Sequence, residues 1–228
     1  MKKDGGLTMD STINGVRVPH ACSVAELAEM CRSGSMQDFT VAAEALGDKD
    51  DDAAFHIWAS YLSDRDKYKR LCAFNVIGNT RYASEITGEI ESALSSPDAL
   101  FRRAALRIAA REDITVSEEG IRSALWSNDA AVDANVYAAA EKLSVCEENY
   151  TFLNALFLNR LPCMAQEILA EVLLRHYSKT HAGRLFELFA ESEHGKIRCL
   201  AVDLAKAHDF DVSRFQNDTD GHVRQRLK

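Results

Sequence analysis

The apolar and polar positions of this 228-residue chain repeat at an almost constant interval. The clearest copy is the segment 96–110, SPDALFRRAALRIAA, in which Phe101 and Ala105 fall on one helix face and arginines fall on another. Ser96 has the side-chain oxygen of an N-cap residue, and Pro97 suits the first position of a helix. The pattern therefore predicts an amphipathic helix that begins at this serine.

Six other segments match this copy when Arg102 is taken as the reference position. Its equivalents recur about every 32 residues, at Thr40, Arg70, Asp133, Gln166, Arg198 and Arg224. Apolar residues stand three positions after each reference, at Ala43, Ala73, Ala105, Val136, Leu169, Ala201 and Leu227. They also stand six positions after it in the first six copies, at Leu46, Val76, Ile108, Ala139, Val172 and Leu204. These columns predict one helix with a buried stripe in every copy.

Side chains that suit helix caps precede each reference position in two further columns. Six positions before it the capping residues are Asp64, Ser96, Ser127, Ser192 and Asp218, whereas Gly34 and Arg160 interrupt the column. Four positions before it stand Asp66, Asp98, Asp129 and Asp220. We expect the earlier column to supply the N-caps, so that the turns repeat together with the core.

A second helix is predicted ahead of each of the first six. Its mark is a pair of apolar residues four positions apart, at Leu27 and Cys31, Trp58 and Leu62, Ile90 and Leu94, Ile121 and Leu125, Leu153 and Phe157, and Leu185 and Phe189. A single helix pair cannot bury its apolar face, so neighbouring pairs must stack. The prediction is one continuous array of helix pairs.

The repeated pattern of apolar, Arg, two residues, Ala, two residues, apolar and small resembles the HEAT-like repeat family. It is clearest in the segments 39–47 (FTVAAEALG), 101–109 (FRRAALRIA) and 197–205 (IRCLAVDLA). The resemblance extends from about residue 22 to the end of the chain. It implies an all-α fold of the armadillo type, a right-handed α-α superhelix with about six helical-hairpin repeats and a shortened C-terminal one.

The two ends and the middle of the chain depart from the regular pattern. Residues 1–21 carry no apolar run and are expected to form a flexible leader, so the repeat domain spans 22–228. Ser23 and Glu26 have the spacing of a capping box that opens the first helix. Asp133 and Gln166 replace arginine, and Pro162 replaces aspartate, so an Asp and Arg ladder should be broken there. Only a short helix, around 212–216, fits before the last copy.

Composition and charge narrow the range of partners. The net charge is −8, which disfavours nonspecific binding to nucleic acid or anionic lipid and favours a basic partner. No segment has the length and apolarity of a membrane helix. Six cysteines lie scattered without a CxxC pair, at Cys22, Cys31, Cys72, Cys146, Cys163 and Cys199. We interpret them as reduced packing residues of a cytoplasmic protein.

Metal, cofactor and catalytic motifs are weak in this sequence. The run DKDDD at 48–52 lacks the alternating ligands of a calcium loop and is interpreted as a linker that places negative charge before the next helix. His176 with His181, and His20 with Cys22, lack a third ligand at a recognisable spacing. We therefore expect no metal, no cofactor and no catalytic residues.

Candidate binding residues lie one and five positions after the reference, because these positions share a helix face. They are Arg103 and Arg107, continued by Arg111, in the third copy, Glu167 and Glu171 in the fifth, Asp203 in the sixth, and the adjacent Tyr137. By resemblance to HEAT-like solenoids, this stripe would line a concave groove whose charge changes sign. The alternative is a solvated face whose arginines are balanced by nearby carboxylates.

The two tryptophans are expected to differ in exposure. Trp58 should be core, and Trp126 should be partly exposed.

Three functions remain open. The favoured one is a non-enzymatic protein-binding module, namely a scaffold, adaptor or inhibitor of the immunity type, with a basic protein as partner. The second is a DNA glycosylase-type enzyme, because some HEAT-like solenoids excise alkylated bases; it requires a basic groove and exposed aromatic side chains. The third is a chromophore-handling protein, since similar repeats occur in bilin lyases.

Overall fold

The computed structural model describes residues 11–13, 16–18, 22–33, 35–49, 51–159 and 161–228. These residues are predominantly helical, which confirms the all-α class at the level of secondary structure. The chain divides into two compact units. The first unit holds Met1–Ala93 and Asp113–Thr115, and the second holds Leu94–Glu112 and Val116–Lys228.

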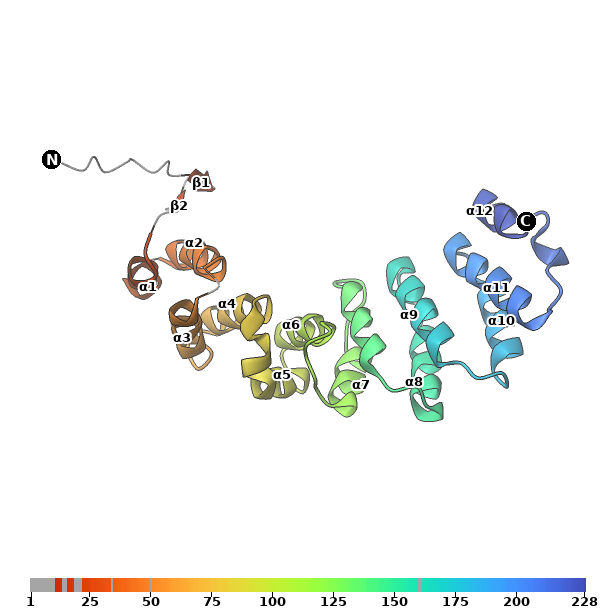
Figure 1. The fold of residues 1–228 in the computed structure, drawn as a ribbon, viewed down its shortest axis with the longest axis horizontal. Coiled ribbons are helices and arrows are strands. Elements are labelled where there is room, and N and C mark those ends of the chain that lie inside the picture. The colour runs from red at the N-terminus through yellow and green to blue at the C-terminus, as the bar shows by residue number, and fades with distance from the viewer. Residues whose placement is uncertain (1–10, 14–15, 19–21, 34, 50, 160) are drawn as a thin grey trace. The chain divides into compact units, whose positions relative to one another are not determined.

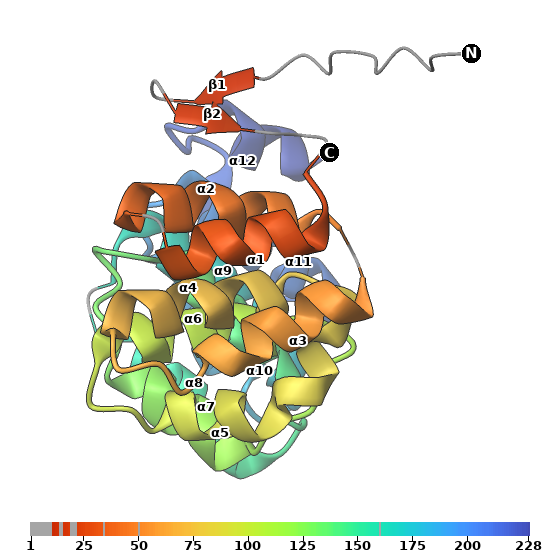
Figure 2. The same ribbon diagram turned by 90° about the vertical axis from the view of Figure 1, so that its left-hand side faces the viewer.

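The first unit contains a short strand pair and the helices of the first copies. Its elements are β1 (Ser11–Ile13), β2 (Val16–Val18), α1 (Val24–Ser33), α2 (Met36–Gly47), α3 (Asp52–Tyr61), α4 (Lys67–Gly78), η1 (Arg81–Ile86) and most of α5 (Thr87–Leu94). The axes of helices α1 to α4 are nearly parallel, so that the helices appear roughly end-on in Figure 1 and side-on in Figure 2.

The strand pair lies inside the segment expected to be a flexible leader. Strands β1 and β2 are antiparallel, with Thr12 opposite Arg17, and β2 contacts α2. The rest of that segment, residues 1–10, 14–15 and 19–21, lies outside the described residues. The leader prediction therefore stays a prediction for those positions.

The start and core of the first unit follow the sequence pattern. Ser23 and Glu26 exchange backbone and side-chain hydrogen bonds, which confirms the capping box ahead of α1. Leu27 and Cys31 are fully buried. Trp58 is 2% exposed and meets the Phe39 ring edge-on with a centroid distance of 5.8 Å, so the prediction that it belongs to the core is confirmed.

The second unit continues the helix pairs. Its elements are α6 (Ala99–Ala109), α7 (Glu118–Trp126), η2 (Asn135–Lys142), α8 (Glu147–Phe157), α9 (Cys163–His176), α10 (Ala182–Ala190), α11 (Gly195–His208), η3 (Ser213–Phe215) and α12 (Gly221–Arg226). The short helix expected near 212–216 is η3. Helix α6 contacts η2, η2 contacts α9, α9 contacts α11, and α11 contacts α12. The second helices of successive copies are therefore neighbours.

The apolar columns form the core of the second unit. The buried residues of the first helices are Ile121, Leu125, Leu153, Phe157, Leu185 and Phe189, and those of the second helices include Ala105, Val136, Leu169, Val172, Ala201 and Leu204. The column assignments are confirmed here. Leu227 near the end of this unit is only half-buried, as are Leu62 and Val76 in the first unit.

Helix starts differ from the expectation by two residues. The N-caps of α4, α6 and α12 are Asp66, Asp98 and Asp220, so the earlier column does not supply them. Instead, Ser96 Oγ accepts a hydrogen bond from the Asp98 N–H at 3.1 Å, and the same bond recurs in other copies. The second, third and seventh copies thus form a small side-chain turn first, and the residue two positions after the start of that turn caps the helix. In the sixth copy the turn is present, but the N-cap His194 makes no side-chain cap bond.

The fourth copy does not form the expected α-helix. Its second helix, η2, is a 3₁₀-helix that begins only after Asp133. Asp129 Oδ1 accepts from the Ala131 N–H, and Asp133 Oδ1 accepts from the Asn135 N–H. Aspartates that bind nearby backbone amides compete with helix hydrogen bonds, so the two carboxylates keep the segment 129–134 in turns.

Candidate functional site

Most of the residues proposed from the sequence lie on the second helices of the second unit. Arg103 and Arg107 are on α6, with Arg111 just beyond its end; Glu167 and Glu171 are on α9; and Asp203 is on α11. All of them are half-buried except Arg107, which is exposed. Since α6, η2, α9 and α11 are successive neighbours, these positions follow one layer of helices.

The arginines of α6 have partners close by. Arg107 Nη1 lies 3.6 Å from Asp133 Oδ2 at the start of the next copy, and Arg103 Nε donates to the Ala99 carbonyl at 3.1 Å. The aspartate that stands at reference position 133 in place of an arginine thus supplies a carboxylate to Arg107 of the preceding copy. This arrangement agrees with the alternative in which nearby carboxylates balance the arginines.

The acidic residues of α9 and α11 are paired across neighbouring copies as well. Lys196 Nζ lies 2.8 Å from Glu171 Oε1 and 3.5 Å from Glu167 Oε2, and the hydrogen bond to Glu171 raises the pKa of this lysine. Arg226 of α12 makes two hydrogen bonds to the Asp203 carboxylate, at 2.8 and 2.7 Å. These side chains are largely solvated, so the pairs orient the surface more than they stabilise the fold.

Tyr137 does not belong to this surface. It lies on η2, is 1% exposed, and its burial raises the pKa of the phenol. Tyr137 stands four positions after the reference, and that column is buried in the α-helical copies as well, at Phe74, Leu106, Ala170 and Val202. The expectation that Tyr137 forms part of a binding surface is wrong.

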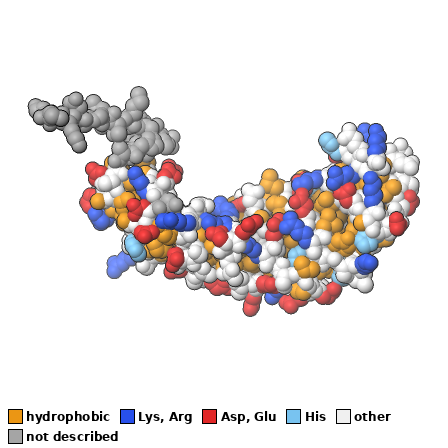
Figure 3. Space-filling view, viewed as in Figure 1, with side chains coloured by type: hydrophobic (Ala, Val, Ile, Leu, Met, Phe, Trp, Pro, Cys, Tyr) orange, Lys and Arg blue, Asp and Glu red, His pale blue; other side chains and the backbone are white. Residues whose placement is uncertain are grey.

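Exposed apolar side chains accompany the charges, which the sequence interpretation missed. Leu100 is 39% exposed and Met164 is 55% exposed, and both stand two positions before the reference of their copies. That position lies three residues before Arg103 and Glu167, on the same helix face. The sequence already indicated that this column faces solvent, because the sixth copy holds Lys196 there and lysine is rarely buried. We call the surface of Leu100, Arg103, Arg107, Met164, Glu167, Glu171, Lys196 and Asp203 the mixed face; Figure 3 shows apolar, basic and acidic side chains interspersed over this unit.

The reference arginines have a common task in the turns. Arg102 Nη1 donates to the Ser96 carbonyl at 2.7 Å, and Arg198 Nη1 donates to the Ser192 and Glu193 carbonyls at 2.9 Å each. Arg224 makes the equivalent bond to the Asp218 carbonyl. In each case the guanidinium binds the carbonyl six positions before it, so that it closes the turn that precedes its own helix.

The same arginines also reach the next copy. Arg102 Nη2 lies 3.4 Å from the Ser127 carbonyl, and Arg198 makes two 2.8 Å bonds to the Asp218 carboxylate. Hydrogen bonding to Arg198 lowers the pKa of Asp218. The arginine column therefore links one turn to the next, and it is interrupted at Asp133 and Gln166, as the sequence predicted.

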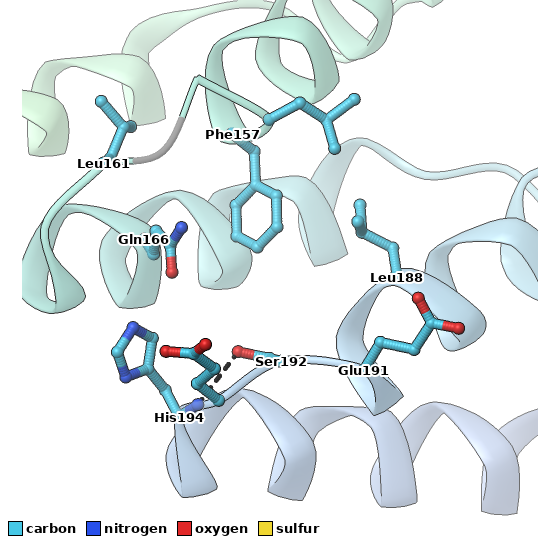
Figure 4. A pocket seen from close by; sticks show the side chains of 9 residues that line it. Phe157, Leu161, Gln166, Leu188, Glu191, Ser192 and His194 are labelled. Carbon is cyan, nitrogen blue, oxygen red and sulfur yellow. Dashed lines mark hydrogen bonds between the residues drawn. The ribbon is translucent and has the colours of Figure 1, made fainter.

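An open cleft lies at the second interruption. It has a volume of about 690 Å³ and lies between the ends of α8 and α10 and the starts of α9 and α11. Phe157, Leu158, Leu161, Gln166, Leu188, Glu191, Ser192, Glu193 and His194 line it. Figure 4 shows Gln166 and Phe157 on one side, Ser192 and His194 on the other, and Glu191 beside Leu188. We call it the Gln166 cleft.

The weaker metal candidates have other roles in the structure. Asp51 caps α3 through the Ala53 N–H, in agreement with the interpretation of the aspartate run as a helix start. His176 is buried, which lowers the pKa of its imidazole, whereas His181 Nε2 lies 3.1 Å from Glu147 Oε1. Among the described residues no group of three or more His, Cys, Asp or Glu is placed to hold a metal ion.

The cysteines and the second tryptophan complete the comparison with the sequence. Cys31 is buried, whereas Cys146 and Cys163 are exposed and so are not packing residues. Trp126 is 55% exposed and lies 6.2 Å from the Phe152 ring, as expected for a partly exposed side chain. In the part of the chain that the structure describes, no helix is long and apolar enough to cross a membrane.

Searches with this chain found no matching family model, no matching curated protein and no matching solved structure.

Proposed function

We propose that this chain is a non-enzymatic interaction module whose second unit binds another protein through the mixed face. The observation that carries the proposal is the pair of exposed apolar side chains at one repeat position, Leu100 on α6 and Met164 on α9, each with charged residues beside it on the same helix. Apolar side chains surrounded by a polar rim are typical of protein interfaces. A scaffold, an adaptor and an inhibitor of the immunity type all use such a surface.

The paired charges support the same function. Two cations hold their carboxylate partners in fixed positions: Lys196 pairs with Glu167 and Glu171, and Arg226 pairs with Asp203. The paired side chains remain partly exposed to solvent. A partner that meets this surface encounters charges already oriented, which favours one arrangement over others. The net charge of −8 favours a basic partner.

We also propose that the helix pairs form a HEAT-like, right-handed α-α superhelix. The succession of neighbouring second helices within the second unit and the recurring turns support this architecture. A superhelix is an elongated particle. Small-angle X-ray scattering should therefore give a radius of gyration well above the ~18 Å expected for a compact domain of this length; a compact value would contradict the superhelix.

The binding proposal is tested by replacing the apolar side chains of the mixed face. The chain is used as bait in a lysate of the cells that produce it, and the captured proteins are identified by mass spectrometry. Leu100→Asp together with Met164→Asp should abolish capture of the specific partner, because each places a charge in the interface core.

Val145→Asp is the matched control, because Val145 is an apolar residue that is 68% exposed and lies outside the mixed face. This variant should retain the partner. Equal capture by the double variant and the unmodified chain would show that the mixed face is not the binding surface. Circular dichroism checks that each variant remains helical.

A further inference from the structure

We propose that the Gln166 cleft is a binding site for an arginine side chain of the partner protein, which takes the place of the arginine missing from the fifth copy. The inference rests on the proposed function, since it assigns one contact within protein binding. It follows from four observations: the arginine column, the residue that interrupts it, the space at that point, and the charge around it.

The arginine column defines what a closed junction between copies contains. The Arg102 guanidinium binds the Ser96 carbonyl of its own copy and approaches the Ser127 carbonyl of the next. The Arg198 guanidinium binds the Ser192 carbonyl of its own copy and the Asp218 carboxylate of the next. In both junctions a planar, positively charged fork lies between two successive turns.

The fifth copy has a shorter side chain at the reference position. Gln166 stands at this position of α9, and the next turn, which contains Ser192 and His194, lies across from it (Figure 4). Glutamine is uncharged and shorter than arginine. Where a guanidinium lies between two turns in other copies, an open cleft of about 690 Å³ lies here, which has room for an arginine side chain.

The walls of the cleft suit an arginine better than another side chain. Phe157, Leu161 and Leu188 provide apolar surface for the aliphatic stem, as such stems commonly pack on apolar side chains. Glu191 and Glu193 are exposed carboxylates that line the same cleft. A guanidinium offers several N–H donors in a flat fork and binds acceptors on two sides, whereas a lysine ammonium is a point charge.

The test measures binding of an arginine probe to the full chain. The probe is the peptide acetyl-Gly-Arg-Gly-amide, and acetyl-Gly-citrulline-Gly-amide is its neutral isostere. Each is titrated into isotope-labelled protein while amide chemical shifts are recorded. The arginine peptide should give saturable shifts at residues 161, 166, 188 and 191–194. The dissociation constant of the citrulline peptide should be higher by about tenfold or more.

Two variants locate the binding. Gln166→Arg restores the column and should abolish the shifts, because the chain's own guanidinium then occupies the cleft. Glu191→Gln with Glu193→Gln removes the carboxylates from exposed positions and should weaken binding severalfold. Glu112→Gln with Glu119→Gln, two exposed glutamates of the same unit, is the matched control and should leave binding unchanged.

The outcomes separate this inference from the proposed function. No saturable shift with the arginine peptide, equal binding of both peptides, or unchanged binding to Gln166→Arg would each overturn the arginine site. None of these results depends on the natural partner. Conversely, loss of partner capture in the mixed-face double variant with normal capture by Gln166→Arg would support the mixed face and overturn the cleft as a contact.

Discussion

The junctions that follow the fifth and sixth copies differ at the reference position, which holds Gln166 in one and Arg198 in the other. In the sixth copy, Arg198 binds two carbonyls of its own turn and the carboxylate of Asp218 in the next. In the fifth copy, Gln166 stands at the same position, and the junction is an open cleft. The helices on both sides keep the same apolar columns. The comparison shows that the apolar columns build the helix pairs in both copies, whereas the side chain that bridges the junction is present only in the sixth.

The largest effect is expected when the closed junction is made to resemble the open one. Arg198→Gln removes the four hydrogen bonds of the guanidinium. The Asp218 side chain, which is only 9% exposed, then loses the counterion that Arg198 provides. Breaking a buried ion pair from one side should lower the free energy of unfolding by about 3 kcal/mol. Urea denaturation followed by circular dichroism measures it.

Arg226→Gln is the control for that variant. Arg226 also makes two hydrogen bonds to an aspartate, Asp203, but its side chain is 54% exposed. Solvent replaces such a pair at little cost, so the loss should be far smaller. Equal losses in the two variants would mean that burial of the Arg198 junction contributes nothing.

A smaller effect is expected from pH at the same junction. Hydrogen bonding to Arg198 holds the pKa of Asp218 below its ordinary value of 3.8, so this carboxylate stabilises the folded state above about pH 4. The contribution disappears as the pH falls through the lower, folded-state pKa, because the folded protein then takes up the proton as well. Asp218→Asn should therefore cost about 2 kcal/mol at pH 7 and progressively less below pH 4.

Denaturant titrations at several pH values between neutral and strongly acidic test this dependence. The quantity to plot is the difference in unfolding free energy between the unmodified chain and Asp218→Asn. A difference that stays constant down to pH 2 would contradict the linkage to this carboxylate.

The smallest effect should come from closing the open junction. Gln166→Arg offers a guanidinium to turn acceptors, which should raise the free energy of unfolding by about 1 kcal/mol. Gln166→Lys adds the same charge without the planar fork and should gain less. Thermal unfolding of the two variants measures the difference, and an equal gain would show that charge alone matters.

The apolar part of the fold was predictable because its cause is local. Burial of Ile121, Leu169 and Ala201 follows from a helical period that repeats with the copies. The helix starts were less certain, since Ser96 and Asp98 both suit an N-cap. Only the structure shows that the first accepts from the amide of the second, which moves the cap by two residues.

The candidate site was only partly predictable. Arg103 and Arg107 do share one face of α6, and Glu167 and Glu171 share one face of α9, because residue spacing alone decides the helix face. The pairing of Lys196 with the two glutamates depends on how neighbouring copies are offset, which sequence spacing does not give. Tyr137 was misplaced because it stands beside the surface column, in a column that is buried in the other copies too, as at Leu106 and Ala170.

The gap in the arginine column also bears on how this unit opens. In a repeat array each helix pair is stabilised mainly by contacts with its neighbours. Local unfolding therefore begins at the junction where two neighbouring pairs make the fewest contacts. Helices α9 and α11 are joined more sparsely than η2 and α9. Amide hydrogens of α10, α11 and α12 should therefore exchange with solvent as one cooperative group, ahead of those in the rest of this unit, because α10 and α11 are closely packed. A partner's arginine in the cleft would slow that exchange.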